Sequence, residues 1–298
     1  MNDGLGAFEA ERPRLRALAY RMLGSIADAD DVVQETWLRW QRLGPDERDA
    51  VERPGAWLTT TASRIALDTL KSARRQREQY VGPWLPEPLL TDDEPASTVE
   101  LAESLTLGFL VVLERLTPVE RAVFLLADVF AEPFSRIATV VDRTEEACRQ
   151  IAARARRRVR DEQRRAGVST PAGRRDELVQ AFVAACVFGQ VDDLRALLAD
   201  DVVLVSDGGR DFHAARRPVV GVDRVSRFLV NVIKKWPGEA TVELHQINGQ
   251  PGLVVLRRGR PAFVVAFDIA GEGDTERIGA VRLVVNPAKL HGVAAAVS

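Results

Sequence analysis

The densest positive charge in this chain lies in the stretch "IAARARRRVR", where five of the ten residues from Ile151 to Arg160 are arginine. Just before it stand Arg149 and Gln150, whose side chains can each form paired hydrogen bonds, arginine with guanine and glutamine with adenine. Guanidinium groups further along can bind phosphate oxygens. Because the formal net charge of the whole chain is only -2, the cluster indicates a local site for a polyanion. The alternative is a solvated helix face with excess charge.

Three helices, with a tight turn between the last two, must position these residues. Thr117, Pro118 and Glu120 have the types of an N-cap, a first helical residue and the closing residue of a capping box. A second short helix is expected over 134–141, "FSRIATVV", and "DRT" then forms a tight turn in which Thr144 caps a third helix. A turn of this length between two helices is typical of a helix-turn-helix, whose second helix enters the DNA major groove.

The third helix has two distinct faces. Apolar residues recur at helical spacing and predict a buried stripe of Cys148, Ile151, Ala152, Ala155 and Val159. The other face carries Arg149, Gln150, Arg154 and Arg157. We expect the first two to reach base edges, and the later arginines, including Arg156, Arg158 and Arg160, to meet phosphates.

A second basic segment follows an acidic helix. The helix within 24–43 places Val33, Thr36, Trp37 and Trp40 on one face and Asp28, Asp31 and Glu35 on another. The helix within 53–78 has Trp57 near its start and is expected to expose Arg64, Lys71, Arg74, Arg75 and Arg77. An aromatic ring beside cations suits a single-stranded nucleic acid, because the ring stacks on a base while the cations follow the backbone. The alternative is a Trp57 packed in the core.

Two breaks divide the chain. Residues 81–97, "VGPWLPEPLLTDDEPAS", contain four prolines and cannot continue a helix, and 164–176 form a shorter break. After residue 200 the pattern changes to short strand-like runs, "DVVLVSD", "GLVVLRRG", "AFVVAFDIAG" and "AVRLVVNP", separated by Gly, Pro and Asp.

The order of these features resembles a bacterial extracytoplasmic-function (ECF) sigma factor over roughly residues 8–165. The resemblance rests on "ADADDVVQETWLRW", "AWLTTTASRIALDTLKSAR", a proline-rich linker and a helix-turn-helix ending in "RARRRV". It implies core RNA polymerase and promoter DNA as partners. It further implies two all-α domains, sigma region 2 at 8–80 and sigma region 4 at 99–165, joined by a linker at 81–98.

The same resemblance assigns roles to the residues identified above. Polymerase binding falls on Asp28, Asp31 and Glu35. Recognition of the minus-10 element as single strand falls on Trp57, Arg64, Lys71, Arg74 and Arg75. Recognition of the minus-35 element as duplex falls on Arg143, Thr144, Arg149, Gln150, Arg154 and Arg157.

Residues 175–298 resemble the SnoaL-like cone-shaped α+β fold, in which a curved sheet wraps around helices. A subgroup of ECF sigma factors carries such an extension, and its marks are present here as "WLPEPL", "SDGG" and "NPAKL". By this resemblance the domain is regulatory, and its loops face the linker. The expected contacts are Trp84, Leu85, Pro86, Asp207, Gly208, Gly209, Arg210, Asn286, Pro287, Lys289 and Leu290.

Two other classes of function stay open at this point. One is a ligand-responsive helix-turn-helix regulator that never joins polymerase, which leaves 24–78 unexplained. The other is an enzyme with an accessory DNA-binding module, whose acid and base would come from Asp207, His213, His245 and Asp268. Related folds use a tyrosine with a protonated acid. The two tyrosines, Tyr20 and Tyr80, both precede the C-terminal domain, so we expect no catalytic residue.

Composition sets the remaining limits. The longest uncharged apolar runs are far shorter than the roughly 20 residues of a membrane span, and the first residues lack an apolar signal core, so we expect a cytoplasmic protein. Cys148 and Cys186 have neither disulfide nor metal-ligand spacing and are expected as buried thiols. We expect no metal and no cofactor. A small ligand inside the C-terminal fold is possible, but no residue identifies one.

Overall fold

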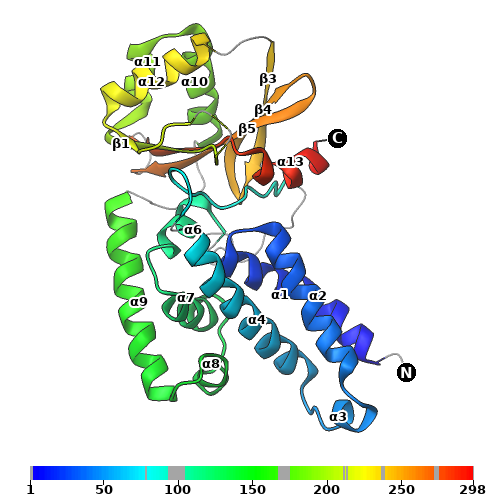
Figure 1. The fold of residues 1–298 in the computed structure, drawn as a ribbon. Helices are drawn as coiled ribbons and strands as arrows, with labels where there is room; N and C mark the ends of the chain where they lie inside the picture. The colour runs from blue at the N-terminus through cyan, green and yellow to red at the C-terminus, as the bar shows by residue number, and fades with distance from the viewer. Residues whose placement is uncertain are drawn as a thin grey trace. The chain divides into compact units, whose positions relative to one another are not determined.

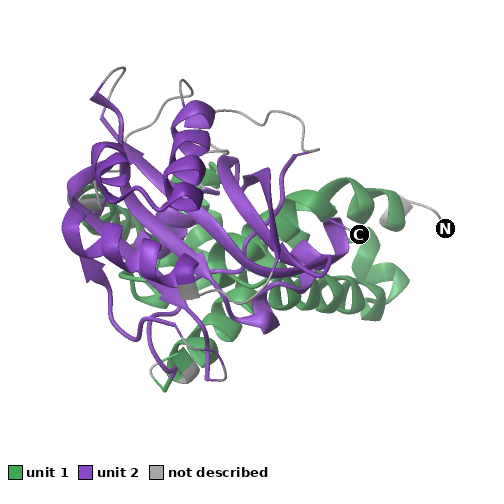
Figure 2. Cartoon of the chain, turned by 90° about the horizontal axis from the view of Figure 1, so that it is seen from above, with its two compact units in different colours: residues 1–79, 113–160 green, residues 80–112, 161–298 purple. Residues whose placement is uncertain are grey.

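The computed structural model describes residues 3–77, 79–92, 105–166, 175–210, 212, 214–235, 239–271 and 275–297 (Figure 1). The chain forms two compact units (Figure 2). One comprises residues 1–79 and 113–160, and the other comprises residues 80–112 and 161–298. Both units therefore combine two separate stretches of sequence. The described part of the expected linker belongs to the same unit as the C-terminal domain; its residues 93–98 lie outside the described residues.

The first unit begins with a helical bundle. Its helices are α1 (Asp3–Leu23), α2 (Ile26–Arg42), the short α3 (Pro45–Asp49) and α4 (Pro54–Arg77). The α1, α2 and α4 helices pack on one another around apolar side chains such as Leu18, Val32 and Leu67. Ser25 caps α2, since its hydroxyl accepts a hydrogen bond from the Asp28 amide. The bundle fixes which faces of α2 and α4 remain exposed.

The second stretch of this unit also folds into helices. They are α7 (Pro118–Phe124), the π-helical turn η1 (Leu125–Val129), α8 (Phe134–Val141) and α9 (Glu145–Ala166). The predicted start of α7 is confirmed, because Thr117 and Glu120 exchange the hydrogen bonds of a capping box ahead of Pro118. Both α7 and α8 pack against α4.

The second unit is built on a six-stranded sheet. The strands are β1 (Leu198–Asp207), β2 (Val219–Val220), β3 (Ala240–Ile247), β4 (Gln250–Arg257), β5 (Arg260–Ala270) and β6 (Arg277–Val284). Their order is β2-β1-β6-β5-β4-β3, with β1 and β6 parallel and all other neighbours antiparallel. The strand-like runs of the sequence correspond to β1, β4, β5 and β6. The edge strand β3 carries "ATVELHQI", a run that the sequence pattern did not single out.

Each face of the sheet has its own cover. On one face lie α10 (Arg175–Phe188), α11 (Val191–Leu197) and α12 (Val222–Lys235), whose apolar side chains form a core with the strands. On the other face lie the linker around Leu85, α6 (Leu107–Leu113), the short η3 (Pro287–Lys289) and α13 (His291–Ala296). Successive strand residues point to opposite faces. The sheet therefore separates a helix face from a linker face.

The expected fold class is confirmed: helical segments are followed by an α+β domain built on a six-stranded sheet. Both cysteines are buried free thiols, as expected. Among the helices that the structure describes, none has the length and apolar composition needed to cross a bilayer.

Candidate nucleic-acid interface and linker-binding cluster

The helix-turn-helix consists of α8, a three-residue turn and α9. The turn begins at Asp142, which adopts the left-handed conformation with φ of 53° and ends α8. It ends at Thr144, whose hydroxyl accepts a hydrogen bond from the Ala147 amide and caps α9. Thr144 is therefore held by its role in the helix cap, while its neighbour Arg143 is exposed.

The two faces of α9 match the sequence pattern. Cys148, Ala152, Ala155 and Val159 are buried, and Ile151 is half-buried. The opposite side exposes Arg149, Gln150, Arg154 and Arg157. These four side chains form the exposed face of α9, and the geometry allows them to approach a duplex.

The arginines of α9 do not all point outward. Arg156 pairs with Asp128 at 2.7 Å, and Arg158 pairs with Glu120 at 2.8 Å. Both carboxylates belong to the preceding helices, so these two arginines fasten α9 to η1 and α7. The sequence predicts that Arg156 and Arg158 contact phosphates, but in this structure both guanidinium groups are already bound to carboxylates.

Arg149 also has an intramolecular partner, but an exposed one. Its guanidinium bonds to Glu145 at 2.7 Å and lies 5.3 Å from the centre of the Phe134 ring. The side chains of Arg149 and Glu145 are 57% and 45% exposed. An exposed ion pair contributes little free energy, so DNA could replace it at small cost. Glu145 thereby helps to orient Arg149 in the absence of DNA.

The acidic residues of α2 lie on its outer side. Asp31 is exposed, Asp28 is half-buried, and Glu35 pairs with Arg39 at 2.9 Å. The opposite side of the helix buries Val33, Thr36 and Trp40, as the sequence pattern predicts. Spacings of three and four residues place the three carboxylates on one stripe of the helix.

On α4, several candidate side chains have structural partners. Trp57 is half-buried, and its ring packs edge-on against Trp40 at a centroid distance of 5.2 Å. Arg64 is exposed and donates to the Thr139 carbonyl, and Arg74 is exposed and donates to the Leu116 carbonyl. Lys71 and Arg75 are exposed, and Lys71 bonds to Asp68 at 2.9 Å. The basic side of α4 thus makes hydrogen bonds within its own unit and also exposes charged groups to solvent.

The prediction that Arg77 is exposed is wrong. Its side chain is only 13% exposed and pairs with Glu114 at 2.7 Å, and it also donates to the Leu23 carbonyl. Glu114 bonds in addition to the buried Arg121. Burial works against ionisation of Glu114, but the two guanidinium groups outweigh it and hold its pKa below the ordinary value. Sequence periodicity could not identify this partner, which lies 37 residues away.

The second candidate site is the linker-binding cluster, defined as Tyr80, Trp84, Asp207, Asn286 and Lys289. At its centre the Asp207 carboxylate is completely buried at the end of β1. It accepts hydrogen bonds from the Leu85 amide at 2.8 Å, from Lys289 at 2.6 Å, from the Gly209 amide at 3.2 Å and from the Tyr80 hydroxyl. The carboxylate thus joins the linker to the C-terminal segment.

Lys289 contributes the opposite charge. Its ammonium group also donates to the Leu85 carbonyl and lies 4.1 Å from the centre of the Trp84 ring. A cation over the face of a tryptophan ring is attracted by the ring electrons, more strongly where water is excluded. Both the amide and the carbonyl of Leu85 are therefore held by the Asp207–Lys289 pair, and the Leu85 side chain is buried on the linker face.

Glycines and Asn286 complete the cluster. Gly209 has φ of 64°, and an added Cβ would lie 2.9 Å from the Asn286 amide nitrogen. Asn286 in turn donates to the Tyr80 hydroxyl at 2.9 Å. At Gly208 an added Cβ would lie 2.7 Å from the Phe212 carbonyl oxygen. The remaining expected contacts are placed as follows: Pro86 and Leu290 are buried, and Arg210 and Pro287 are exposed.

A further stretch of the linker binds the edge strand β3, which the sequence did not indicate. Thr91 donates from its amide to the Gln246 carbonyl at 2.8 Å, and the Asn248 side chain accepts from the Leu89 amide at 3.0 Å. Asp92 accepts from the Gln246 amide at 2.7 Å and lies 2.8 Å from His245. The linker is thus attached at two places.

Those of the possible acid and base residues that the structure describes do not come together in one site. Asp207 is used by the linker-binding cluster, and His245 lies between Asp92 and Glu243. Asp268 is buried against Arg282, and Gly108 of α6 packs so closely on it that a Cβ would lie 2.4 Å from its Oδ1. His213 lies outside the described residues. Tyr80 does reach the C-terminal domain, but burial and Asp207 raise its pKa, so the phenol stays neutral.

Comparisons with known proteins identify the class. The Sigma-70 region 2 family model matches residues 7–76, and the Sigma-70 region 4 model matches residues 108–159. These two regions define a sigma factor, the subunit that brings core RNA polymerase to promoter DNA. The α2 and α4 helices lie in the first match, and the helix-turn-helix lies in the second.

Comparison with individual relatives identifies the family of sigma factors. The chain is 41% identical over 251 residues to the ECF RNA polymerase sigma factor SigJ of Mycobacterium tuberculosis H37Rv, covering 82% of this chain and 78% of that one. It is 35% identical over 288 residues to the probable ECF sigma factor SigI of the same species, covering 95% and 93%. The crystal structure of M. tuberculosis SigJ has a TM-score of 0.75 and 32% identity, covering 97% and 98%.

The chain therefore belongs to the ECF RNA polymerase sigma factors. It is an alternative sigma factor with a C-terminal SnoaL-like domain, so of the functions considered from the sequence the comparisons support transcription initiation.

Proposed function

We propose that the two DNA-binding tasks of this sigma factor are divided between α9 and α4. The exposed face of α9 reads the minus-35 element as duplex, with Arg149 and Gln150 at base edges and Arg154 and Arg157 on phosphates. The observation that carries this proposal is the exposure of these four side chains on the helix that follows a capped three-residue turn. Arg143 and Thr144 would contact the backbone at the start of the helix.

In the same proposal, α4 binds the minus-10 element and α2 binds the core polymerase. Arg64, Lys71, Arg74 and Arg75 are exposed and would follow the backbone of an opened strand. Trp57 is only half-buried, so part of its ring remains available for a base. The carboxylates of Asp28, Asp31 and Glu35 would dock on the core enzyme. We also propose a cytoplasmic location, because core polymerase and promoter DNA are found there.

We further propose that the C-terminal domain acts as a regulator rather than an enzyme, and that it acts by holding the linker. The linker connects the region 2 helices to the region 4 helices, so its path limits the distance between the two DNA-binding elements. The support is that the Asp207–Lys289 pair binds both backbone groups of Leu85. A held linker would restrict which spacing of minus-10 and minus-35 elements the protein accepts.

Run-off transcription with purified core polymerase tests both proposals. Promoter-dependent initiation should require this protein. Templates whose spacer is shortened or lengthened one base pair at a time should be rejected by the unmodified protein and tolerated more widely by Lys289→Met. Lys234→Met is the matched control, because Lys234 is an exposed lysine on α12. Identical spacer profiles for all three proteins would contradict a role of the cluster in spacing.

A further inference from the structure

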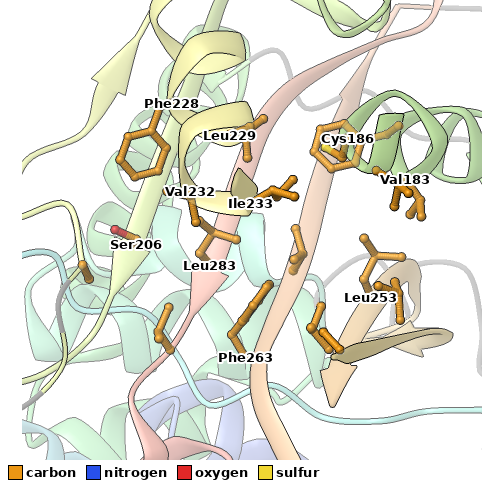
Figure 3. Close-up of a pocket in the computed structure, with 18 residues that line it drawn as sticks. Val183, Cys186, Ser206, Phe228, Leu229, Val232, Ile233, Leu253, Phe263 and Leu283 are labelled. Atoms are coloured by element: carbon orange, nitrogen blue, oxygen red, sulfur yellow. The ribbon is translucent and has the colours of Figure 1, made fainter. Parts of the chain in front are cut away.

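The helix face of the C-terminal sheet contains a cavity of about 360 Å³ (Figure 3). Its walls come from α10, α12 and the strands, and Figure 3 shows Leu229, Val232 and Ile233 of α12 arranged around it. Cavities that take small molecules have volumes of roughly 300–1,000 Å³. Protein interiors rarely leave empty spaces much larger than a water molecule, and the cost of an unfilled cavity rises with its volume. A space of this size therefore suggests an occupant.

The cavity has an inner end and a mouth. Residues of its inner wall, including Phe182, Leu253 and Val265, are buried. Four lining residues are exposed and mark the mouth: Val187 at 64%, Ile233 at 37%, Val242 at 38% and Ala240. They come from the end of α10, from α12 and from β3, so a molecule can enter between these elements without passing through the core.

The lining determines the chemistry of the occupant. Among the residues that the structure describes, no charged side chain lines the cavity. The Ser206 hydroxyl accepts a hydrogen bond from the Ala215 amide at 2.7 Å and donates one to the Ala215 carbonyl at 3.4 Å, so its single donor is already used within the chain. Burial raises the pKa of the Cys186 thiol to about 12, so this side chain is neutral near pH 7. A charged molecule would lose its hydration without gaining a partner.

We propose that this cavity binds a small, neutral, largely hydrocarbon molecule with at most one polar group. The cavity is separate from the linker-binding cluster. Ser206 points into the cavity from β1, whereas the next residue, Asp207, binds the linker on the other face. Binding therefore needs neither the cluster nor DNA, and the proposal can succeed or fail independently of the function proposed for the linker.

Fluorescence of N-phenyl-1-naphthylamine, a neutral apolar probe, tests the proposal on the full-length protein. We expect saturable binding of one probe per chain, with 1-decanol displacing it about tenfold or more better than decanoate or decylammonium of equal chain length. Binding that does not saturate, or equal displacement by the three competitors, would overturn the proposal. So would binding that disappears when the protein dimerises, which would make the mouth an interface between copies.

Two substitutions test whether the probe binds inside the cavity. Val183→Phe and Val232→Phe fill the space from α10 and α12, and each should weaken probe binding about tenfold or more. Asn231→Phe is the matched control, because it adds the same ring beside Val232 on an exposed position outside the lining. Circular dichroism melting curves identify any variant that fails to fold. Folded filling variants with unchanged binding would refute the assignment.

Cysteine labelling of the unmodified protein tests the same assignment and does not depend on whether the two filling variants fold. Cys186 lines the cavity, whereas Cys148 is buried in the helix-turn-helix. N-ethylmaleimide is small and neutral, so it can enter the cavity. Labelling at about pH 9 increases the thiolate fraction of Cys186, whose pKa is raised by burial, and mass spectrometry reads the label on each cysteine. Saturating 1-decanol should slow labelling of Cys186 about fivefold or more and leave Cys148 unchanged. Equal effects on both cysteines, or none on Cys186, would count against the cavity.

Discussion

The linker-binding cluster and the exposed face of α9 use the same kinds of charged side chain for opposite purposes. In the cluster Asp207 is completely buried and Lys289 is 9% exposed, so each charge depends on the other and on nearby backbone groups. On α9 the Arg149 side chain is more than half exposed, and water or DNA can replace its ion pair with Glu145.

Burial is what separates the two regions. A buried charge that loses its partner has no water to replace it, whereas an exposed one is solvated at once. Substitutions in the cluster should therefore change the stability of the domain and the path of the linker. Substitutions on α9 should change DNA binding and leave stability nearly unaltered.

The largest effect is expected for Asp207→Ala. It leaves the Lys289 ammonium buried without its counter-charge, and breaking a buried pair from one side costs about 3–5 kcal/mol in the free energy of unfolding. Urea denaturation measures this loss of free energy from the unfolding transition of the C-terminal unit. Asp201→Ala, an exposed position on the same strand, is the control.

The double variant Asp207→Ala with Lys289→Met sharpens this expectation. Removing both charges should recover part of the loss, because the remaining cost is then mainly that of hydrogen bonds to Leu85. If the two single effects simply add, the buried pair does not behave as a unit.

Arg149→Ala tests the exposed face of α9. It should reduce the preference of the protein for its minus-35 element by about 1–3 kcal/mol, because a bidentate contact with a base is lost. Competition binding of specific and random duplex to the holoenzyme gives this preference. Arg16→Ala on α1 serves as the control, since Arg16 is exposed and lies outside the helix-turn-helix. Equal loss on both duplexes would assign Arg149 to the phosphates.

A smaller and different effect is expected for Arg157→Ala. We assign Arg157 to a phosphate, so its loss should weaken binding to all sequences alike and reduce the slope of log affinity against log salt concentration by about 1. Titrations at several salt concentrations measure the slope. A change confined to one promoter sequence would instead indicate that Arg157 reads a base.

Sequence alone was sufficient where local rules decide the structure. The capping box at Thr117, the turn at Asp142 and the buried stripe of α9 follow from residues a few positions apart, and all three are present. The strands β1, β4, β5 and β6 were also predictable, because continuous apolar runs are bounded there by Gly, Pro and Asp.

Sequence failed where partners are distant along the chain. Nothing near Arg77 indicated Glu114, and nothing near Asp92 indicated His245, 153 residues later. The strand β3 was missed because it has no continuous apolar run: its apolar residues alternate with polar ones, and Val242 and Leu244 are exposed at the edge of the sheet. The residues that line the apolar cavity give no signal of their own, since they are the same types that form an ordinary core.

The His245–Asp92 contact gives the smallest expected effect. Burial favours the neutral imidazole, but hydrogen bonds to Asp92 and Glu243 outweigh it and raise the pKa of His245 above its ordinary value. A raised folded-state pKa contributes stability below the unfolded value of about 6.5, and this contribution disappears as pH rises through the folded value. Because the carboxylates are partly exposed, we expect about 1 kcal/mol or less. Melting temperatures at several pH values should thus fall more for the unmodified protein than for His245→Gln as pH rises from 6 to 8, and parallel curves would mean that protonation of His245 does not help to hold the linker.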